Sequence, residues 1–222
     1  MDELIAGYRR FRETRFRTEA ARFRRLAIQG QSPKAVVVAC CDSRVDPQMV
    51  FSAAPGDLFV VRNVANLVPP YQATEEYHGT SAAIEFAIRA LQIPRLIVMG
   101  HSQCGGIRAM LGDGLESHDF LGPWMEIAAD ARAACKDHPP EAAQRIGELE
   151  GIRISLRNLM TFPWIRERVE AGTLILEGLL FDVGAGELLR LDPGTGAFSA
   201  VPAEDRGAVT RRLLQRSRRR TR

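Results

Sequence analysis

The sequence predicts one α/β domain with a mostly parallel central β-sheet flanked by helices. Three short apolar runs, at 34–40, 58–61 and 96–99, have the length and composition of buried strands. Stretches with a helical spacing of apolar residues alternate with these runs, which is typical of parallel βαβ units. No internal repeat or low-complexity linker interrupts the 222 residues. We therefore expect a single domain over 1–205, followed by an Arg-rich tail over 206–222.

The first 28 residues are expected to form an amphipathic helix before the strand at 34–40. Arginines occupy one face, and apolar residues recur with helical spacing on the other. These apolar residues are Leu4, Tyr8, Phe11, Phe16, Ala20, Phe23 and Ala27. Gly30 and Pro33 then end the helix.

The rest of the chain continues this alternation. Helical spacing over 80–93 predicts a helix between the second and third strands, and Gly105 and Gly106 open a short helix to about Leu111. Residues 122–170 are predicted to be mainly helical, with interruptions at prolines. A final β region with Gly-containing turns is predicted over 173–199.

Composition indicates an ordinary globular protein, with 45% hydrophobic and 26% charged residues. No apolar run approaches the roughly 20 residues that a membrane-spanning helix needs. Met1–Ile5 carries acids where a secretory signal peptide would carry basic residues. We therefore expect a cytoplasmic protein with no membrane partner.

The formal charge of +3 is unevenly distributed along the chain. All eight charged residues after Asp205 are arginines, in the tail at 206–222. An Arg-rich segment can contact nucleic acid or an anionic lipid surface. Because a solvated chain terminus can have the same composition, we expect that nucleic acid is not a partner.

Residues that bind metal ions follow two of the predicted strands. Cys40 ends the first strand, and His101 and Cys104 follow the third. In open α/β sheets, ligands bind beyond the carboxyl ends of the strands. If the two strands are neighbours, these three side chains converge. Two thiolates and one imidazole suit Zn²⁺, and three protein ligands leave a fourth position for water, as in catalytic zinc sites.

The other two cysteines are not expected to bind the metal ion or to form a disulfide. A disulfide between the adjacent residues Cys40 and Cys41 would be strained. Cys135 would close the zinc site if it were a fourth ligand, but its surroundings have helical character.

These motifs resemble the signature of the β-carbonic anhydrases: Cys-x-Asp-Ser-Arg at 40–44 and His-x-x-Cys-Gly-Gly at 101–106. Further segments that are similar to the family lie at 30–34, 55–66, 68–71, 79–86, 155–159 and 181–188. The resemblance covers nearly everything except the Arg-rich tail. It implies the family fold and a lyase that reversibly hydrates carbon dioxide to bicarbonate through zinc-bound hydroxide. It also implies a homodimer or a higher homo-oligomer.

The resemblance implies roles for individual residues. It places the ligands of one Zn²⁺ per subunit at Cys40, His101 and Cys104. Cys41 falls on a variable position of the motif. Asp42 and Arg44 match the catalytic pair of the family, in which the carboxylate accepts a hydrogen bond from the hydroxide and the guanidinium keeps that carboxylate ionised.

Substrate-binding residues are implied in the same way. Gln31 matches a glutamine that donates to a substrate oxygen, and an apolar pocket for carbon dioxide is matched by Phe59, Val64 and Phe86. The family often has tyrosine at the position of Phe86, so a hydroxyl is missing there. Val37 stands where some bacterial members carry tryptophan, which favours a subtype resembling the plant enzymes.

The resemblance further implies that the N-terminal helix at 1–28 packs on a partner subunit and that both subunits shape each active-site cleft. Three alternatives stay open. Asp42 can take the fourth zinc position if its pairing with Arg44 breaks. The same fold and ligand set can hydrolyse carbon disulfide or carbonyl sulfide. A structural zinc in a nucleic-acid-binding module would require a fourth protein ligand.

Overall fold

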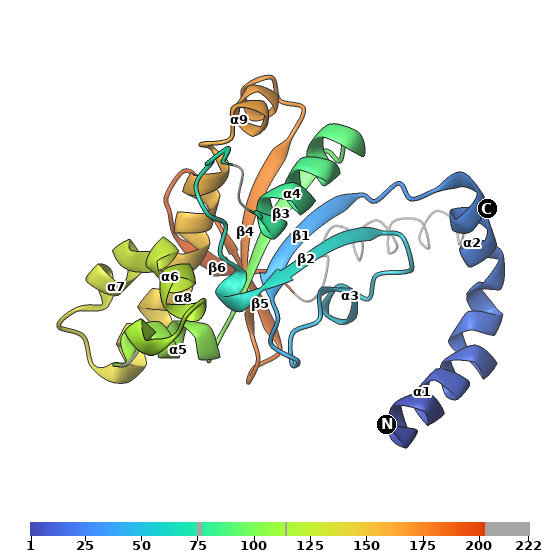
Figure 1. Cartoon of the computed structure of the whole chain (residues 1–222), viewed down its shortest axis with the longest axis horizontal. Coiled ribbons are helices and arrows are strands. Elements are labelled where there is room, and N and C mark those ends of the chain that lie inside the picture. Colours follow the sequence, from blue (N-terminus) through green and yellow to red (C-terminus); the bar gives the residue numbers. More distant parts are fainter. Residues whose placement is uncertain (75–76, 114, 203–222) are drawn as a thin grey trace, which may run out of the picture.

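A computed structural model of the chain describes residues 1–74, 77–113 and 115–202 (Figure 1). The Arg-rich tail predicted at 206–222 lies outside the described residues. No helix in the described part of the chain combines the length and apolar character that crossing a membrane requires.

A six-stranded sheet with the order β2-β1-β3-β4-β5-β6 forms the centre of the molecule. Its strands are β1 (Ala35–Cys40), β2 (Leu58–Asn63), β3 (Arg95–His101), β4 (Ile175–Asp182), β5 (Glu187–Leu191) and β6 (Phe198–Ala200). The first four strands pair in parallel, whereas β5 and β6 pair antiparallel. This arrangement confirms the predicted α/β class with a mostly parallel sheet.

Helices surround the sheet at its faces and ends. They are α1 (Asp2–Glu13), α2 (Arg15–Gln29), α3 (Pro47–Val50), α4 (Gly79–Glu85), α5 (Gly105–Leu111), α6 (Leu121–Met125), α7 (Ala129–Cys135), α8 (Pro140–Leu159) and α9 (Pro163–Glu170). A π-helical turn, Phe86–Ala90, continues α4. The predicted helical segments are therefore present, although those over 80–93 and 122–170 are divided into shorter helices.

The buried strand β1 lies between β2 and β3, as its run of valines predicts. Val36 and Val38 pack on one face in a core cluster with residues of α4, α8 and α9. Val37 faces the opposite side, in a cluster with Met99 and Leu179. Alternation along the strand thus buries both faces, which explains why β1 is apolar throughout.

Two glycines allow α8 to approach the sheet closely. A Cβ atom added at Gly100 on β3 would lie 2.8 Å from Cδ1 of Ile152 on α8. One added at Gly178 on β4 would lie 2.9 Å from Cγ2 of the same isoleucine. The Ile152 side chain therefore occupies space that any larger residue at either strand position would need.

The N-terminal segment is divided into two helices rather than forming the single predicted helix. At Thr14 the backbone leaves the helical region, with φ −111° and ψ −88°. This break brings together the rings of Phe11 and Phe16, whose centroids lie 6.0 Å apart. In a continuous helix, residues five positions apart do not share a face. Figure 1 shows α1 and α2 extending away from the sheet, and neither helix contains a buried residue.

Candidate metal centre

Three predicted metal ligands converge at the carboxyl end of the sheet. Cys40 is the last residue of β1 and His101 the last of β3. Because these strands are parallel neighbours, both residues lie at the same edge. Cys104, at the start of α5, completes the group. The ligand atoms of the three buried residues all lie within 4.8 Å of one another.

The geometry of this group fits Zn²⁺. The two Sγ atoms of Cys40 and Cys104 lie 4.0 Å apart, and two thiolates bound tetrahedrally at about 2.3 Å would be about 3.8 Å apart. His101 Nδ1 lies 2.9 Å from the Ser102 carbonyl oxygen, to which it donates, so Nε2 keeps its lone pair. Nε2 is buried and has no hydrogen-bond partner within the described residues. A metal ion would satisfy this nitrogen.

Mutual interactions shift the pKa values of all three groups. A hydrogen bond from the Cys104 thiol lowers the pKa of Cys40 to about 4, against the opposing effect of burial. The same hydrogen bond, together with burial, raises the pKa of Cys104. Burial is the largest single effect on His101 and opposes its charge, but Cys40, the Ser102 carbonyl oxygen and Asp42 together outweigh burial and raise the pKa of His101. These shifts favour the thiolate form at Cys40, which is the form that binds a metal ion.

Asp42 and Arg44 form the pair that the motif implies. Arg44 donates through Nε and Nη2 to the two carboxylate oxygens of Asp42, at 2.9 and 2.7 Å. It also donates to the carbonyl oxygen of Gln103 at 3.0 Å. The guanidinium holds the pKa of Asp42 well below its usual range. Asp42 Oδ2 lies 4.0 Å from His101 Nε2, so an ionised carboxylate faces the candidate zinc position.

Arg62 supports the backbone beside Cys40. Its Nε donates to the Cys40 carbonyl oxygen at 2.9 Å, and its Nη2 donates to the Asp42 carbonyl oxygen at 2.6 Å. Asp46 accepts from Nη1 at 3.2 Å. Arg62 therefore fixes the loop that carries both a predicted ligand and the carboxylate.

The predicted substrate-binding residues do not gather at this centre within one chain. Val64 lies beside it, because a Cβ atom added at Gly106 would be 2.7 Å from Val64 Cγ1. Gln31, in contrast, precedes β1, and a six-residue strand spans about 17 Å. Phe59 pairs with Val36 near the amino end of β1. Phe86 lies next to Phe59, with ring centroids 6.1 Å apart, so these residues lie toward the opposite end of the sheet.

The remaining cysteines lie outside the group. Cys41 is exposed, and Cys135 is buried and donates to the Ala143 carbonyl oxygen at 3.1 Å. In the described ranges the metal-binding group has three members and no fourth. A three-ligand set is the arrangement of catalytic zinc sites, whereas structural sites have four protein ligands.

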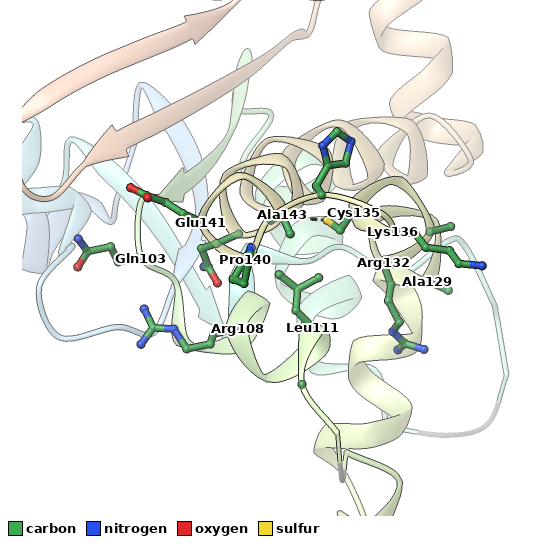
Figure 2. A pocket seen from close by; sticks show the side chains of 14 residues that line it. Gln103, Arg108, Leu111, Ala129, Arg132, Cys135, Lys136, Pro140, Glu141 and Ala143 are labelled. Atoms are coloured by element: carbon green, nitrogen blue, oxygen red, sulfur yellow. Dashed lines mark hydrogen bonds between the residues drawn. The ribbon is translucent and has the colours of Figure 1, made fainter.

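A cavity of about 1200 Å³ lies between α5, α7 and α8, and Gln103, the residue before Cys104, is part of its lining (Figure 2). Basic side chains, apolar side chains and Gln144 of α8 line it. Figure 2 shows Gln103 and Arg108 on one side of it and Arg132 and Lys136 on the other. None of the three predicted ligands lines this cavity.

The fold and the site define a class of protein: an open α/β metalloenzyme with a Cys-His-Cys zinc site at the carboxyl edge of its sheet. The family model "Carbonic anhydrase" matches residues 35–188. Together with the relatives described below, this match shows that the chain belongs to the β-carbonic anhydrases.

Curated relatives include two Arabidopsis thaliana proteins. Beta carbonic anhydrase 3 is 33% identical over 91% of this chain and 80% of its own length. The chloroplastic beta carbonic anhydrase 5 is 36% identical over 80% of this chain, which spans only 60% of that relative. A carbonic anhydrase from Synechocystis is 35% identical over 86% of this chain and 71% of its own length.

Solved structures agree with this relationship. The β-carbonic anhydrase CcaA superposes with a TM-score of 0.85 at 35% identity, over 90% of this chain and 99% of that one. A tetrameric β-carbonic anhydrase from Sordaria macrospora gives 0.72 at 28% identity, over 90% of this chain and 98% of its own.

Proposed function

We propose that this chain is a zinc-dependent lyase that reversibly hydrates carbon dioxide to bicarbonate and a proton. The observation that carries the proposal is the three-ligand group of Cys40, His101 and Cys104, faced by an ionised carboxylate 4.0 Å from His101 Nε2. A structural zinc would need a fourth protein ligand, so this arrangement supports catalysis over a nucleic-acid-binding module.

Zn²⁺ held by these residues would lower the pKa of a water molecule in its fourth coordination position toward neutrality. Asp42 Oδ2 is placed where it would accept a hydrogen bond from that water and orient the oxygen lone pair toward the substrate carbon. Arg44 keeps Asp42 ionised and turned into the crevice through two hydrogen bonds. Because both oxygens of Asp42 accept hydrogen bonds from Arg44, the carboxylate is held beside the metal position and would not itself be a ligand. Val64 supplies an apolar contact for carbon dioxide, which is small and uncharged.

We infer that Gln31, Phe59 and Phe86 act in the active site of a partner subunit. The length of β1 separates this group from Cys40 in its own chain, and Phe86 is 49% exposed. In a two-fold dimer, each such group could complete the zinc centre of the other subunit. Gln31 would then donate to a substrate oxygen, and the two rings would close the apolar pocket.

The α1–α2 arm (Asp2–Gln29) would pack on that partner subunit. The arm buries no residue of its own, and it exposes Leu4, Ile5 and Tyr8. Its hydrogen bonds to the body come from Arg15, which donates to the Ala53 carbonyl oxygen, and from Arg22, which donates to the Pro55 carbonyl oxygen and pairs with Asp57. An apolar stripe with this much exposure is typical of an interface. The assembly is therefore a homodimer or a higher homo-oligomer.

We place the enzyme in the cytoplasm, as one domain over 1–205 with an Arg-rich tail over 206–222. We do not expect nucleic acid to be a partner. Removing 206–222 would then leave carbon dioxide hydration unchanged.

Replacing Asp42 with Asn tests the catalytic assignment. We expect Asp42→Asn to retain one zinc per subunit, because Asp42 is not a ligand, and to lose hydration by about 100-fold or more. Mass spectrometry measures zinc per subunit, and stopped-flow kinetics near pH 8 measures hydration. Cys41→Ser, an exposed neighbouring position, should match wild type. Zinc-loaded wild type that is inactive with carbon dioxide over the alkaline range would refute the proposal, and carbon disulfide would be assayed next.

Mixed dimers test the shared site. A dimer of one Gln31→Ala chain and one Cys40→Ser chain, isolated with two affinity tags, contains one complete site if Gln31 acts in the partner. It should then show about half of wild-type activity. The reciprocal dimer carries both substitutions in one chain, beside a wild-type chain, and should show only the low activity of Gln31→Ala. The opposite ranking of the two dimers would place Gln31 in the site of its own chain.

A further inference from the structure

The side chain of Glu148 on α8 is a buried carboxylate that the proposed mechanism does not use. The residue is 4% exposed, and acids are rarely buried unless they are paired or hydrogen-bonded. The nearest cation is Arg145, whose Nη1 lies 3.9 Å from Glu148 Oε2 and 4.0 Å from Asp182 Oδ2. Because this ion pair is long and shared with Asp182, it does not by itself account for the burial.

The short contacts of Glu148 lead to a metal ligand instead. The backbone N–H of Cys104 donates to Glu148 Oε1 at 3.1 Å. Gln144, one turn earlier on α8, donates from Nε2 to the same Oε1 at 2.7 Å and to the Cys104 carbonyl oxygen at 3.0 Å. Two side chains of α8 therefore hold both backbone polar groups of Cys104.

Cys104 is the ligand that most needs such support. Cys40 and His101 belong to sheet strands, whose ladders fix their backbones. Cys104 follows Gln103, which has a φ of +57°, a left-handed conformation uncommon for a residue with a side chain. Its own side chain makes no capping hydrogen bond at the start of α5. Arg44 holds the carbonyl oxygen of Gln103, and the contacts from α8 hold the backbone of Cys104 itself.

We propose that Glu148, with Gln144, is a positioning residue that aims the Cys104 thiolate at the zinc ion. The inference rests on the proposed zinc enzyme, since it concerns how that site is held. Residues that orient metal ligands typically change metal affinity by about 10- to 100-fold when they are removed. Glu148 acts through the Cys104 backbone and touches neither substrate nor metal.

Zinc affinity, measured by competition with a chromophoric chelator, tests the proposal without any catalytic assay. Glu148→Leu should bind zinc about 10- to 100-fold more weakly, because it removes the acceptor of Cys104 N–H. Glu148→Gln keeps an acceptor oxygen at this place and should restore most of the affinity. Glu150→Leu is the matched control: this acid lies on the same helix and pairs with Arg153, so its loss should leave zinc affinity unchanged.

Cobalt substitution supplies a second readout that a purely structural role would not change. The thiolate-to-cobalt absorption bands of Glu148→Leu should shift or weaken relative to those of Glu150→Leu at matched cobalt occupancy. If Glu148→Leu does not fold, Gln144→Met replaces it, since Gln144 is among the residues that line the cavity between α5, α7 and α8. This variant should also weaken zinc binding and alter the bands.

Two results would overturn the inference: a folded Glu148→Leu protein with wild-type zinc affinity and cobalt spectrum, or a folded Gln144→Met protein with both unchanged. The outcome is separable from that of the proposed function. A wild type that binds zinc but does not hydrate carbon dioxide would refute the enzyme and leave the positioning role of Glu148 standing.

Discussion

Cys40→Ser is expected to lose its zinc and, with it, carbon dioxide hydration down to the uncatalysed background. Serine offers a hydroxyl that does not ionise at neutral pH, whereas the pKa of Cys40 is lowered to about 4 by the Cys104 thiol beside it. The substitution therefore removes a thiolate ligand and leaves His101 and Cys104 as an incomplete set. Zinc per subunit by mass spectrometry and stopped-flow hydration measure the two losses.

The control for this experiment is Cys41→Ser, one residue along the chain. Cys41 is exposed and lies outside the metal-binding group, so its zinc content and activity should match those of wild type. If Cys40→Ser kept one zinc per subunit and normal turnover, Cys40 would not be a ligand and the candidate metal centre would be wrong.

Phe162→Ala is expected to have the largest effect on the free energy of unfolding, a loss of about 3–5 kcal/mol. Phe162 is 2% exposed. Its ring lies against Tyr71 and Trp164, with centroid distances of 5.4 and 5.3 Å. Truncation would leave a cavity in the larger core cluster, at the start of α9.

Urea denaturation at fixed protomer concentration measures this loss. Phe120→Ala is the comparison: this phenylalanine is 87% exposed, and its removal should change stability by no more than about 0.5 kcal/mol. Equal midpoints for the two variants would show that the Phe162 ring does not contribute to the core as its contacts indicate.

Local sequence patterns were sufficient for much of the fold. The valines of β1 predict a strand that is buried on both faces, and Cys40 and His101 at the ends of neighbouring strands predict a shared edge. The break at Thr14 could not be predicted, because the apolar spacing of 1–28 is compatible with one helix. The break places the ring of Phe11 beside those of Phe16 and Phe23, a contact that periodicity does not reveal.

The candidate site was predictable only in part. Motif similarity names Gln31 and Phe86 but contains no information about which chain supplies them, because that depends on distances across the sheet. Glu148 had no recognisable signal. A Gln and a Glu four residues apart occur on many helices, and only the packing of α8 brings this pair to Cys104, 44 residues earlier in the sequence.

Because α8 packs closely on the two strand glycines, a substitution in this part of the core can affect residues elsewhere on α8. Ile152, which fills the space above Gly100 and Gly178, lies one helical turn after Glu148. Helix and sheet are in close contact there. If a smaller residue replaced Ile152 and α8 moved toward the sheet, the Glu148 carboxylate would move with it. The packing of Ile152 on the sheet and the binding of zinc through Cys104 are therefore expected to depend on each other. A substitution at Ile152 would therefore be expected to change zinc affinity as well as stability, although Ile152 is not a metal ligand.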